Sequence, residues 1–262
     1  MKKILLLVIL ILPMNLLAKD NVDLQADENL IRSVSSPVYR VALLELYTSE
    51  GCSSCPPADR FLSNLKTSGI SGKQLIPMAF HVTYWDYIGW KDRFAKKQYD
   101  QRQRNLAHKK NKTTIYTPQF VLVGDDYRLY ATFSNDIKKL TAEKSEVDLV
   151  LSTRQDGAKL HIKLSSDISR SSAKDVGIYF VVVENNLRSS VSDGENEGEI
   201  LQHDYVVRQL LGPYLQRKSE NFLETEHIIT IPQAWKKRDL SIIAFAENVH
   251  TGEVLQAVRL NY

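Results

Sequence analysis

The sequence predicts an α/β domain followed by an all-β, sandwich-like domain with one short helix. In the first half, apolar runs alternate with segments of helical pattern. In the second half, about six apolar runs are separated by polar turns, as is typical of a β-sandwich. The pattern changes near Glu146, so we expect domains over 38–145 and 146–262, after a signal peptide (1–18) and a mobile leader (19–37).

The first half is predicted to run strand, helix, strand, helix, strand, strand, helix. Pro56 and Pro57 favour a helix start, and Asn135 or Ser134 is suited to cap the last helix. The turn at 124–126 indicates a hairpin. In chain order, the predicted elements are 41–47, 56–65, 74–82, 92–110, 116–124, 127–133 and 135–144.

The second half is predicted to contain strands and a single helical stretch, 201–211. The expected strands are 147–153, 159–164, 176–183, 225–231, 240–246 and 253–260.

Composition places the chain among globular proteins. Apolar residues make up 43% and charged residues 25%, and 262 residues are enough for two ordinary domains. The net charge of +3 is too small to imply a polyanionic partner, so we expect no nucleic-acid binding. The basic run 91–112 indicates a solvated helix face or, alternatively, a surface for an acidic client.

The N-terminus has the pattern of a secretory signal. Lys2 and Lys3 precede an apolar stretch over 4–12, and Ala18 ends a possible cleavage site. The stretch is short for a membrane span. We therefore expect an exported, periplasmic or secreted protein with no stable span after cleavage; an uncleaved N-terminal anchor is the alternative.

The only two cysteines, Cys52 and Cys55, stand three residues apart. A C-x-x-C between a predicted strand and a predicted helix is a thioredoxin-type arrangement, and the element order agrees with it. The first domain is therefore predicted to be thioredoxin-like. A structural staple is the alternative, but a four-residue ring would stabilise the fold by only about 2 kcal/mol.

Cysteines at a helix start are suited to thiol chemistry. The thiolate is the attacking species, and a helix N-terminus favours it. We expect Cys52 to be the nucleophile and Cys55 the resolving thiol, with both sulfurs open to water and facing Pro118. Because Cys55 precedes Pro56, the helix is predicted to begin at the proline, with Cys55 in the capping region.

Thr117 and Pro118 are predicted to face these cysteines. Pro118 opens an apolar strand after a basic helix, where a cis bond would expose the backbone of Thr117 to an extended substrate. An ordinary trans proline at an edge strand is the alternative.

An aromatic segment follows the second strand, at the sheet edge where α/β folds place their sites. Tyr84, Trp85 and Asp86 are its candidate substrate-binding residues, although core or lid packing would also explain the aromatic side chains. Asp86 is suited to shuttle protons during exchange. A salt bridge from Asp86 to Lys91 or Arg93 is equally consistent with the sequence.

Two further sets of polar residues have alternative interpretations. His81 is either a ligand to a soft metal beside Cys52 and Cys55 or a hydrogen-bonded histidine at a strand end. Four polar residues of the second half suggest catalysis: Glu195, His203, Asp204 and Arg208. The alternative is a salt bridge between Asp204 and Arg208 on a helix.

Three blocks of the sequence resemble a known family. The first reads Glu-Leu-Tyr-Thr-Ser-Glu-Gly-Cys-Ser-Ser-Cys-Pro-Pro-Ala-Asp over 45–59, the second covers 81–90, and the third is Tyr-Thr-Pro-Gln over 116–119. They look like the signature of secreted bacterial thioredoxin-like proteins of unknown function. The resemblance implies a thioredoxin-like domain fused to a β-rich domain, and it implies no substrate.

Three functions fit these observations. The first is an exported thiol–disulfide oxidoreductase that uses Cys52 and Cys55 on a protein or small-thiol client and needs no cofactor. The second is a Cu(I)-binding module built from the two cysteines and His81. The third is a ligand-binding protein whose cysteines are not catalytic.

Overall fold

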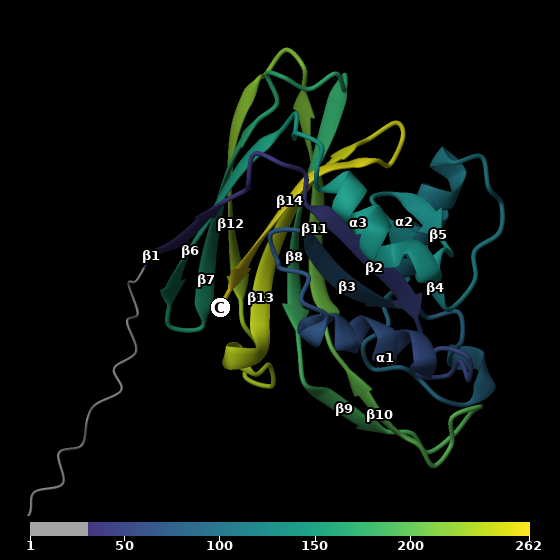
Figure 1. Cartoon of the computed structure of the whole chain (residues 1–262). Coiled ribbons are helices and arrows are strands. Elements are labelled where there is room, and N and C mark those ends of the chain that lie inside the picture. Colours follow the sequence, from purple (N-terminus) through teal and green to yellow (C-terminus); the bar gives the residue numbers. More distant parts are fainter. Residues whose placement is uncertain (1–30) are drawn as a thin grey trace, which may run out of the picture.

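The computed structural model describes residues 31–262, in which strands hold 44% of the residues and helices 18%. Its largest element is an eight-stranded mixed sheet in the order β14-β13-β8-β11-β3-β2-β4-β5 (Figure 1). In that order the strands are Val254–Asn261, Leu240–Asn248, Asp175–Glu184, Val206–Arg217, Leu75–His81, Ala42–Thr48, Gln119–Leu122 and Asp125–Tyr127.

The other strands form two smaller sheets. A four-stranded sheet has the order β1-β6-β7-β12, and β9 pairs with β10 in a hairpin. In chain order these six strands are Ile31–Ser35, Asp148–Asp156, Lys159–Asp167, Leu187–Ser190, Ile200–His203 and Phe222–Thr230.

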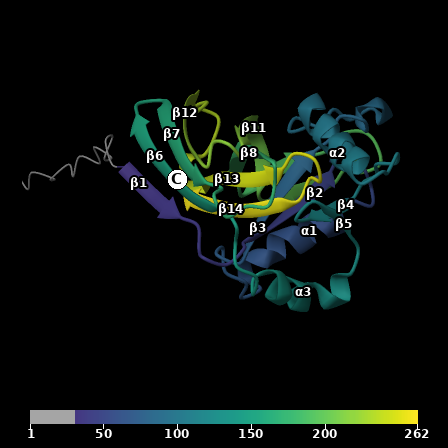
Figure 2. The same cartoon turned by 90° about the horizontal axis from the view of Figure 1, so that it is seen from above.

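Three α-helices cover the part of the large sheet formed by β2, β3 and β4. They are α1 (Pro56–Asn64), α2 (Lys97–Lys109) and α3 (Phe133–Leu140). Tyr99 of α2 packs with one set of β2 and β3 side chains, whereas α1 and α3 pack with the opposite set. Figure 2 shows α2 and α3 on opposite sides of this sheet. No helix among residues 31–262 has the length and hydrophobicity needed to cross a bilayer.

β2 and β3 are buried on both faces because α2 packs on one face and α1 and α3 pack on the other. All seven residues of β2 and all seven of β3 are buried, and the two strands are parallel. Such strands are continuous apolar runs, which is the pattern found at 41–47 and 74–82.

β8 and β13 also have a hydrophobic core on each of their two faces. Tyr179 and Phe245 stack on each other in the core beneath α2, with ring centroids 4.6 Å apart. Phe180 and Ala244 point to the other side, where the four-stranded sheet packs. Alternate residues of one strand therefore belong to different cores.

The predicted division into a thioredoxin-like α/β domain and a separate β-sandwich is wrong. β11 of the second half pairs in parallel with β3 of the first, with Val206 opposite Ala79. The N–H of Ala79 donates to the carbonyl of Tyr205 at 2.8 Å. Both halves therefore contribute to one predominantly β structure with few helices, and no thioredoxin-like α/β fold is evident in residues 31–262.

The predicted helix at 201–211 is also wrong, because β10 and β11 occupy this segment. Tyr205 between them has a φ of 57°, in the left-handed region that interrupts a helix. Asp204 pairs with Lys66, and Arg208 pairs with Glu184 at 3.1 Å, so the expected Asp204–Arg208 salt bridge does not form.

Other predicted boundaries shift. The strand expected over 127–133 stops at Tyr127, and a 3₁₀ turn and α3 follow it. In the predicted leader (19–37), Ile31–Ser35 forms β1, paired with β6. The predicted signal peptide lies outside the described residues.

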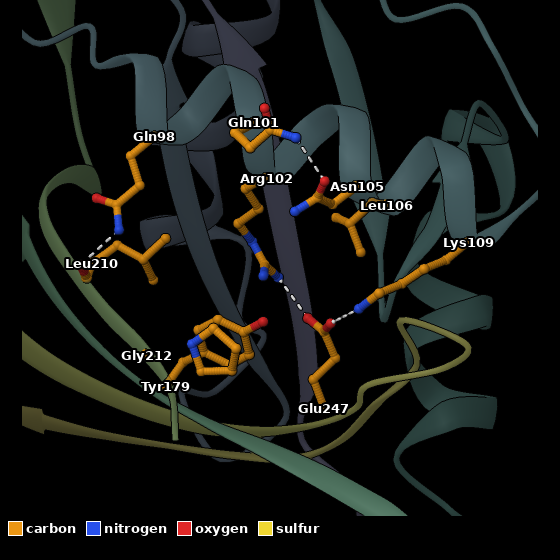
Figure 3. A pocket seen from close by; sticks show the side chains of 11 residues that line it. Gln98, Gln101, Arg102, Asn105, Leu106, Lys109, Tyr179, Leu210, Gly212 and Glu247 are labelled. Atoms are coloured by element: carbon orange, nitrogen blue, oxygen red, sulfur yellow. Dashed lines mark hydrogen bonds and ion pairs between the residues drawn. The ribbon is translucent and has the colours of Figure 1, made fainter. Parts of the chain in front are cut away.

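A buried ion pair ties α2 to both halves of the large sheet. Arg102 of α2 is 6% exposed. Its Nη2 lies 2.6 Å from Glu45 Oε1 of β2 and 3.0 Å from Glu247 Oε2 of β13. Lys109 Nζ lies 2.6 Å from the other oxygen of Glu247. Figure 3 draws this contact and the one between Arg102 and Glu247. Two cations therefore neutralise two buried carboxylates.

Replacing Arg102 with alanine should strongly destabilise the protein. The substitution leaves Glu45 and Glu247 buried with one cation fewer, and losing one partner of such a pair costs roughly 3–5 kcal/mol. We expect urea denaturation to show a loss of this size, whereas Arg104→Ala, an exposed position on the same helix, should change the free energy of unfolding by less than about 0.5 kcal/mol. Equal losses in both variants would show that the ion pair does not join the two halves.

Candidate functional site

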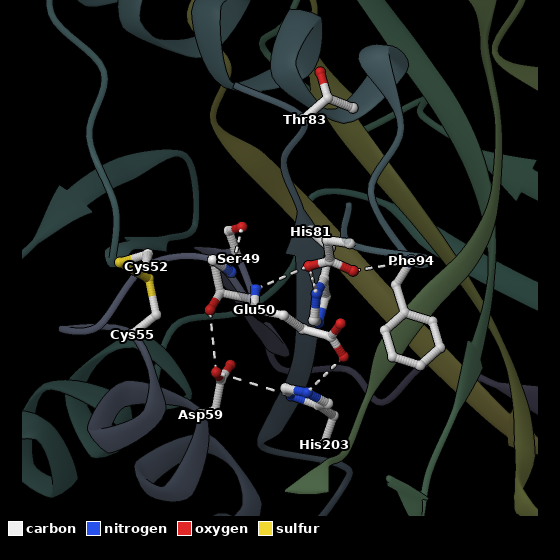
Figure 4. Close-up of polar contacts among 12 residues, drawn as sticks. Ser49, Glu50, Cys52, Cys55, Asp59, His81, Thr83, Phe94 and His203 are labelled. Atoms are coloured by element: carbon white, nitrogen blue, oxygen red, sulfur yellow. Dashed lines mark hydrogen bonds and ion pairs between the residues drawn. A yellow bond between two sulfur atoms is a disulfide. The ribbon is translucent and has the colours of Figure 1, made fainter. Parts of the chain in front are cut away.

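The cysteine pair lies in the loop between β2 and α1. Cys52 and Cys55 form a disulfide with their Cα atoms 5.4 Å apart. Helix α1 begins at Pro56 with Cys55 as its N-cap, as the sequence predicted. Cys55 nevertheless keeps helical dihedrals, φ −77° and ψ −38°, despite the proline that follows it. The motif is shown in Figure 4.

The start of α1 offers the sulfurs fewer hydrogen-bond donors than the sequence suggested. Pro56 and Pro57 fill the first two helical positions and have no N–H. The next two N–H groups, of Ala58 and Asp59, both donate to the carbonyl of Cys55. The side-chain contact at sulfur is instead Ser54 Oγ, 3.3 Å from Cys52 Sγ. This hydroxyl is therefore the group placed to stabilise a Cys52 thiolate.

Both cysteines are buried, with exposed fractions of 1% for Cys52 and 0% for Cys55. The expectation that their sulfurs are open to water is therefore wrong. Two segments that follow β3 and β9 close around the motif. One precedes α2, and the other is the 191–199 loop that connects β9 to β10. We call the second segment the cap.

The cap is held to the motif by side-chain hydrogen bonds. Asn196 Nδ2 donates to the carbonyl of Glu50 at 2.8 Å and to that of Cys52 at 3.0 Å. Glu195 Oε2 accepts from Ser53 N at 2.9 Å and from Ser53 Oγ at 2.7 Å. A segment from the second half of the chain is thus fixed over the cysteine motif of the first.

The aromatic segment predicted to bind substrate lies against the motif. A Cβ added to Gly51 would stand 3.5 Å from Trp85 Cβ and 3.2 Å from Ile88 Cδ1. Trp85 Nε1 donates to Thr117 Oγ1 at 2.6 Å. The structure therefore brings Trp85, Thr117 and the cysteine loop together.

The other predicted binding residues have different surroundings. Tyr84 turns toward α2, where its hydroxyl donates to Gln103, and burial raises the pKa of Tyr84 to about 12. Asp86 accepts from the N–H of Asp92 at 3.3 Å, and the ion pairs of residues 31–262 do not include it. Neither contact connects these side chains to sulfur.

The Thr117–Pro118 peptide bond is cis, as the sequence predicted. The antiparallel register places Gln119 opposite Tyr47, so Thr117, two residues earlier, lies beside the end of β2. That end leads directly into the cysteine loop. The predicted placement of Thr117 near the motif is therefore consistent with the register.

A buried group of acids and histidines lies under the motif. His81 Nδ1 is 2.6 Å from Asp92 Oδ2, and the same oxygen accepts from the N–H of Glu50 at 2.9 Å. Glu50 Oε1 lies 3.2 Å from His203 Nε2, and His203 Nδ1 lies 3.9 Å from Asp59 Oδ2. All five side chains are buried. Figure 4 shows Asp59 between Cys55 and His203.

Burial and pairing shift the pKa values of this group in different directions. Burial lowers the pKa of His81, but the charge and hydrogen bond of Asp92 outweigh it and raise that pKa to about 9. Burial raises the pKa of Asp59, and His203 offsets only part of this effect. Burial acts the same way on Glu50, but contacts led by that of His203 bring its pKa below the usual value.

Asp59 is the acid closest to the cysteines along the helix. It follows Cys55 by four residues, so the two side chains lie on one face of α1. Thr48 Oγ1 donates to Asp59 Oδ2 at 3.1 Å. Its raised pKa favours the protonated carboxyl, which can exchange a proton with a neighbouring thiolate.

Sequence reasoning missed Asp59 as a site residue, although its i,i+4 spacing from Cys55 was visible. It also missed Glu50 and Asp92. His203 was noticed, but nothing local indicated that it would meet the first half of the chain. Parallel pairing of β2 with β3 places Thr48 opposite His81, and this register depends on an alignment of strands that spacing does not reveal.

A cleft of about 390 Å³ opens beside the motif, between α1 and β10. Its walls include Ser53, Pro56, Asp59, Asn196 and His203. A separate cavity of about 140 Å³ lies beneath α2, next to Arg102 and Glu247 (Figure 3).

The predicted metal site finds no support in the side-chain arrangement. Among residues 31–262 there is no group of three or more His, Cys, Asp or Glu side chains placed to hold a metal ion. Cys52 and Cys55 are bonded to each other, and His81 is paired with Asp92. His81 therefore matches the alternative of a hydrogen-bonded histidine at a strand end.

Comparison with known proteins identifies the family. The family model described as a protein of unknown function (DUF1223) matches residues 43–246. The chain belongs to the DUF1223 family. Comparison with curated proteins gives no match.

Two solved structures resemble this DUF1223 protein. Protein AGR_C_4864 from Agrobacterium tumefaciens has 20% identity and a TM-score of 0.59, over 84% of this chain and 94% of the other. HBP35 of Porphyromonas gingivalis has 14% identity and a TM-score of 0.66, over 86% and 76%. At these identities the likeness concerns the fold alone.

Stability should fall with rising pH because of His81. Its pKa rises from 6.5 to about 9 on folding, so its contribution is complete below pH 6.5 and is lost as the pH rises through 9. We expect the free energy of unfolding, from urea denaturation, to decrease by about 3 kcal/mol between pH 6 and 9.5. Asp92→Asn should remove most of this decrease, whereas His250→Asn, at an exposed histidine, should preserve it. An equal decrease in Asp92→Asn would contradict the assignment.

Proposed function

We propose that this DUF1223 protein is a thiol–disulfide oxidoreductase whose redox pair is Cys52 and Cys55. The observation that supports this most directly is the position of the disulfide, at the start of α1 and one helical turn from a buried carboxyl, Asp59. A ring of four residues contributes only about 2 kcal/mol to stability, so a purely structural role gains little.

The chemistry is an exchange of disulfides between the motif and a client. A client thiolate attacks one sulfur of the Cys52–Cys55 bond, forms a mixed disulfide and releases the other cysteine as a thiolate. A second client thiol then attacks the mixed disulfide. Two client thiols become one disulfide, and the motif takes up two electrons and two protons. A client disulfide reverses the sequence.

Two side chains are placed to assist this exchange. Asp59, whose pKa burial raises, is placed to supply a proton to the thiolate formed at Cys55 and to recover it in the reverse direction. Ser54 Oγ supplies a hydrogen bond to Cys52. We accordingly retain Cys52 as the attacking thiolate and Cys55 as the resolving one.

Access requires the cap to move, because both cysteines are buried. The hydrogen bonds of Glu195 and Asn196 connect it to the backbone and the Ser53 hydroxyl of the motif. Hydrogen bonds of this kind contribute about 1 kcal/mol each, somewhat more where a charge is involved. Their loss is compatible with a transient opening of the loop.

The burial of the sulfurs also favours a second candidate, a binding protein in which the disulfide fixes one wall of the α1–β10 cleft. In that case the pair would resist reduction until the protein unfolds. Measuring whether the disulfide can be reduced in the folded protein therefore separates the two functions. We further propose export of the protein, on the basis of the predicted signal sequence.

The disulfide should be reversibly reducible in the folded protein. We expect maleimide labelling and mass spectrometry in dithiothreitol redox buffers to show one two-electron couple, while circular dichroism shows that the fold is retained. Cys55→Ser should retain disulfide-bearing clients as mixed disulfides through Cys52, whereas Cys52→Ser, which lacks the attacking thiol, and the double variant should retain none. Labelling that occurs only at the rate of global unfolding would exclude the oxidoreductase and favour the binding protein.

Weakening the cap should accelerate reduction. Glu195→Ala combined with Asn196→Ala removes four hydrogen bonds to the motif, and each 1.4 kcal/mol gained in opening is a factor of ten. We expect at least a tenfold faster reaction with dithiothreitol under native conditions. Glu197→Ala, an exposed cap residue without such contacts, is the matched control. An unchanged rate in the double variant would show that the cap does not control access.

A further inference from the structure

The α1–β10 cleft carries opposite charges on its two walls. Arg60 lies on α1, and Glu199 lies where the cap meets β10; both line the cleft and are exposed. The ion pairs of residues 31–262 include neither of them. Each charge is therefore available to a ligand that enters between the walls.

The cleft also contains buried polar groups. Asp59 and His203 line it, and they are only 6% and 2% exposed. His203 Nε2 lies 3.2 Å from Glu50 Oε1, whereas its Nδ1, 3.9 Å from Asp59 Oδ2, has no hydrogen-bond partner within the described residues. A buried polar group without a partner costs free energy, so this histidine is suited to receive a hydrogen bond from, or give one to, a bound molecule.

The cleft is connected to both the disulfide and the cap. Ser53, between the two cysteines, and Pro56, directly after Cys55, both line it. Asn196 also lines it, and the same side chain bonds to the carbonyl of Cys52. A ligand that contacts Asn196 would compete with this hydrogen bond, so that occupancy of the cleft favours opening of the cap.

We infer that the cleft binds a small zwitterionic peptide thiol, whose carboxylate lies at Arg60 and whose ammonium group lies at Glu199. The inference rests on the proposed function, because such a ligand would present its thiol beside Cys52 and Cys55. A volume of about 390 Å³ falls in the range of small-molecule sites, roughly 300–1,000 Å³. Both charged termini are needed, which favours a free peptide over an internal segment of a protein.

The test uses S-methylglutathione, which has both charged ends and no free thiol, with the oxidised protein. Isothermal titration calorimetry should show one site. Arg60→Glu and Glu199→Lys should each weaken binding at least tenfold. The matched controls Arg104→Glu, on an exposed face of α2, and Glu197→Lys, elsewhere in the cap, should bind like the unmodified protein.

The outcomes separate this inference from the proposed function. Absence of binding, or equal binding by all four variants, would overturn the cleft assignment and leave the redox couple standing. A peptide of the same sequence with acetylated and amidated ends should bind at least tenfold more weakly; equal binding would point to a protein client and overturn the assignment. Binding of S-methylglutathione without any redox couple would preserve the cleft and exclude the oxidoreductase.

Discussion

The parallel contact between β3 and β11 is the constraint on which the candidate site depends. It joins Ala79 to Val206, and closing so long a loop costs conformational entropy that the surrounding burial must offset. The contact fixes the preceding hairpin β9–β10 alongside α1, as Figure 1 shows. His203 is thereby brought to Glu50, and the cap is brought to the cysteine loop.

Local patterns predicted many elements correctly, because burial and turn chemistry are recorded in neighbouring residues. Continuous apolar runs indicated β2 and β3, and Pro56 marked the start of α1. Strand partners are not recorded locally. Val206 and Val207 have strand-forming side chains, but nothing in their spacing says that they pair with β3 rather than with another β-rich segment. The predicted division into two folds failed at this point.

The candidate site likewise contains features that local sequence predicts and features that depend on tertiary structure. The cysteine pair, the cis bond before Pro118 and the proximity of Trp85 follow from sequence-local features. Glu195 and Asn196 contact the motif only because the chain returns over it, and their acidic and amide side chains are ordinary for an exposed turn. Burial of the sulfurs therefore came from tertiary structure. The same holds for His203, whose role depends on two acids that are remote in sequence.

In the proposed exchange, the charges beneath the disulfide would limit the free-energy cost of reducing so buried a pair. Breaking the disulfide creates a thiolate, which is costly where water is excluded. Asp92 remains ionised beside a protonated His81, so this pair contributes little net charge. Burial raises the pKa of Asp59, which favours its neutral form, and in the proposed exchange a proton passed from a neutral Asp59 to sulfur would transfer one negative charge instead of adding a second. A chain with an ionised acid at position 59 would have to place two negative charges within one helical turn. In the proposed function, a neutral carboxyl at this position would make the buried thiol pair chemically usable, and the cap would control a client's access to it.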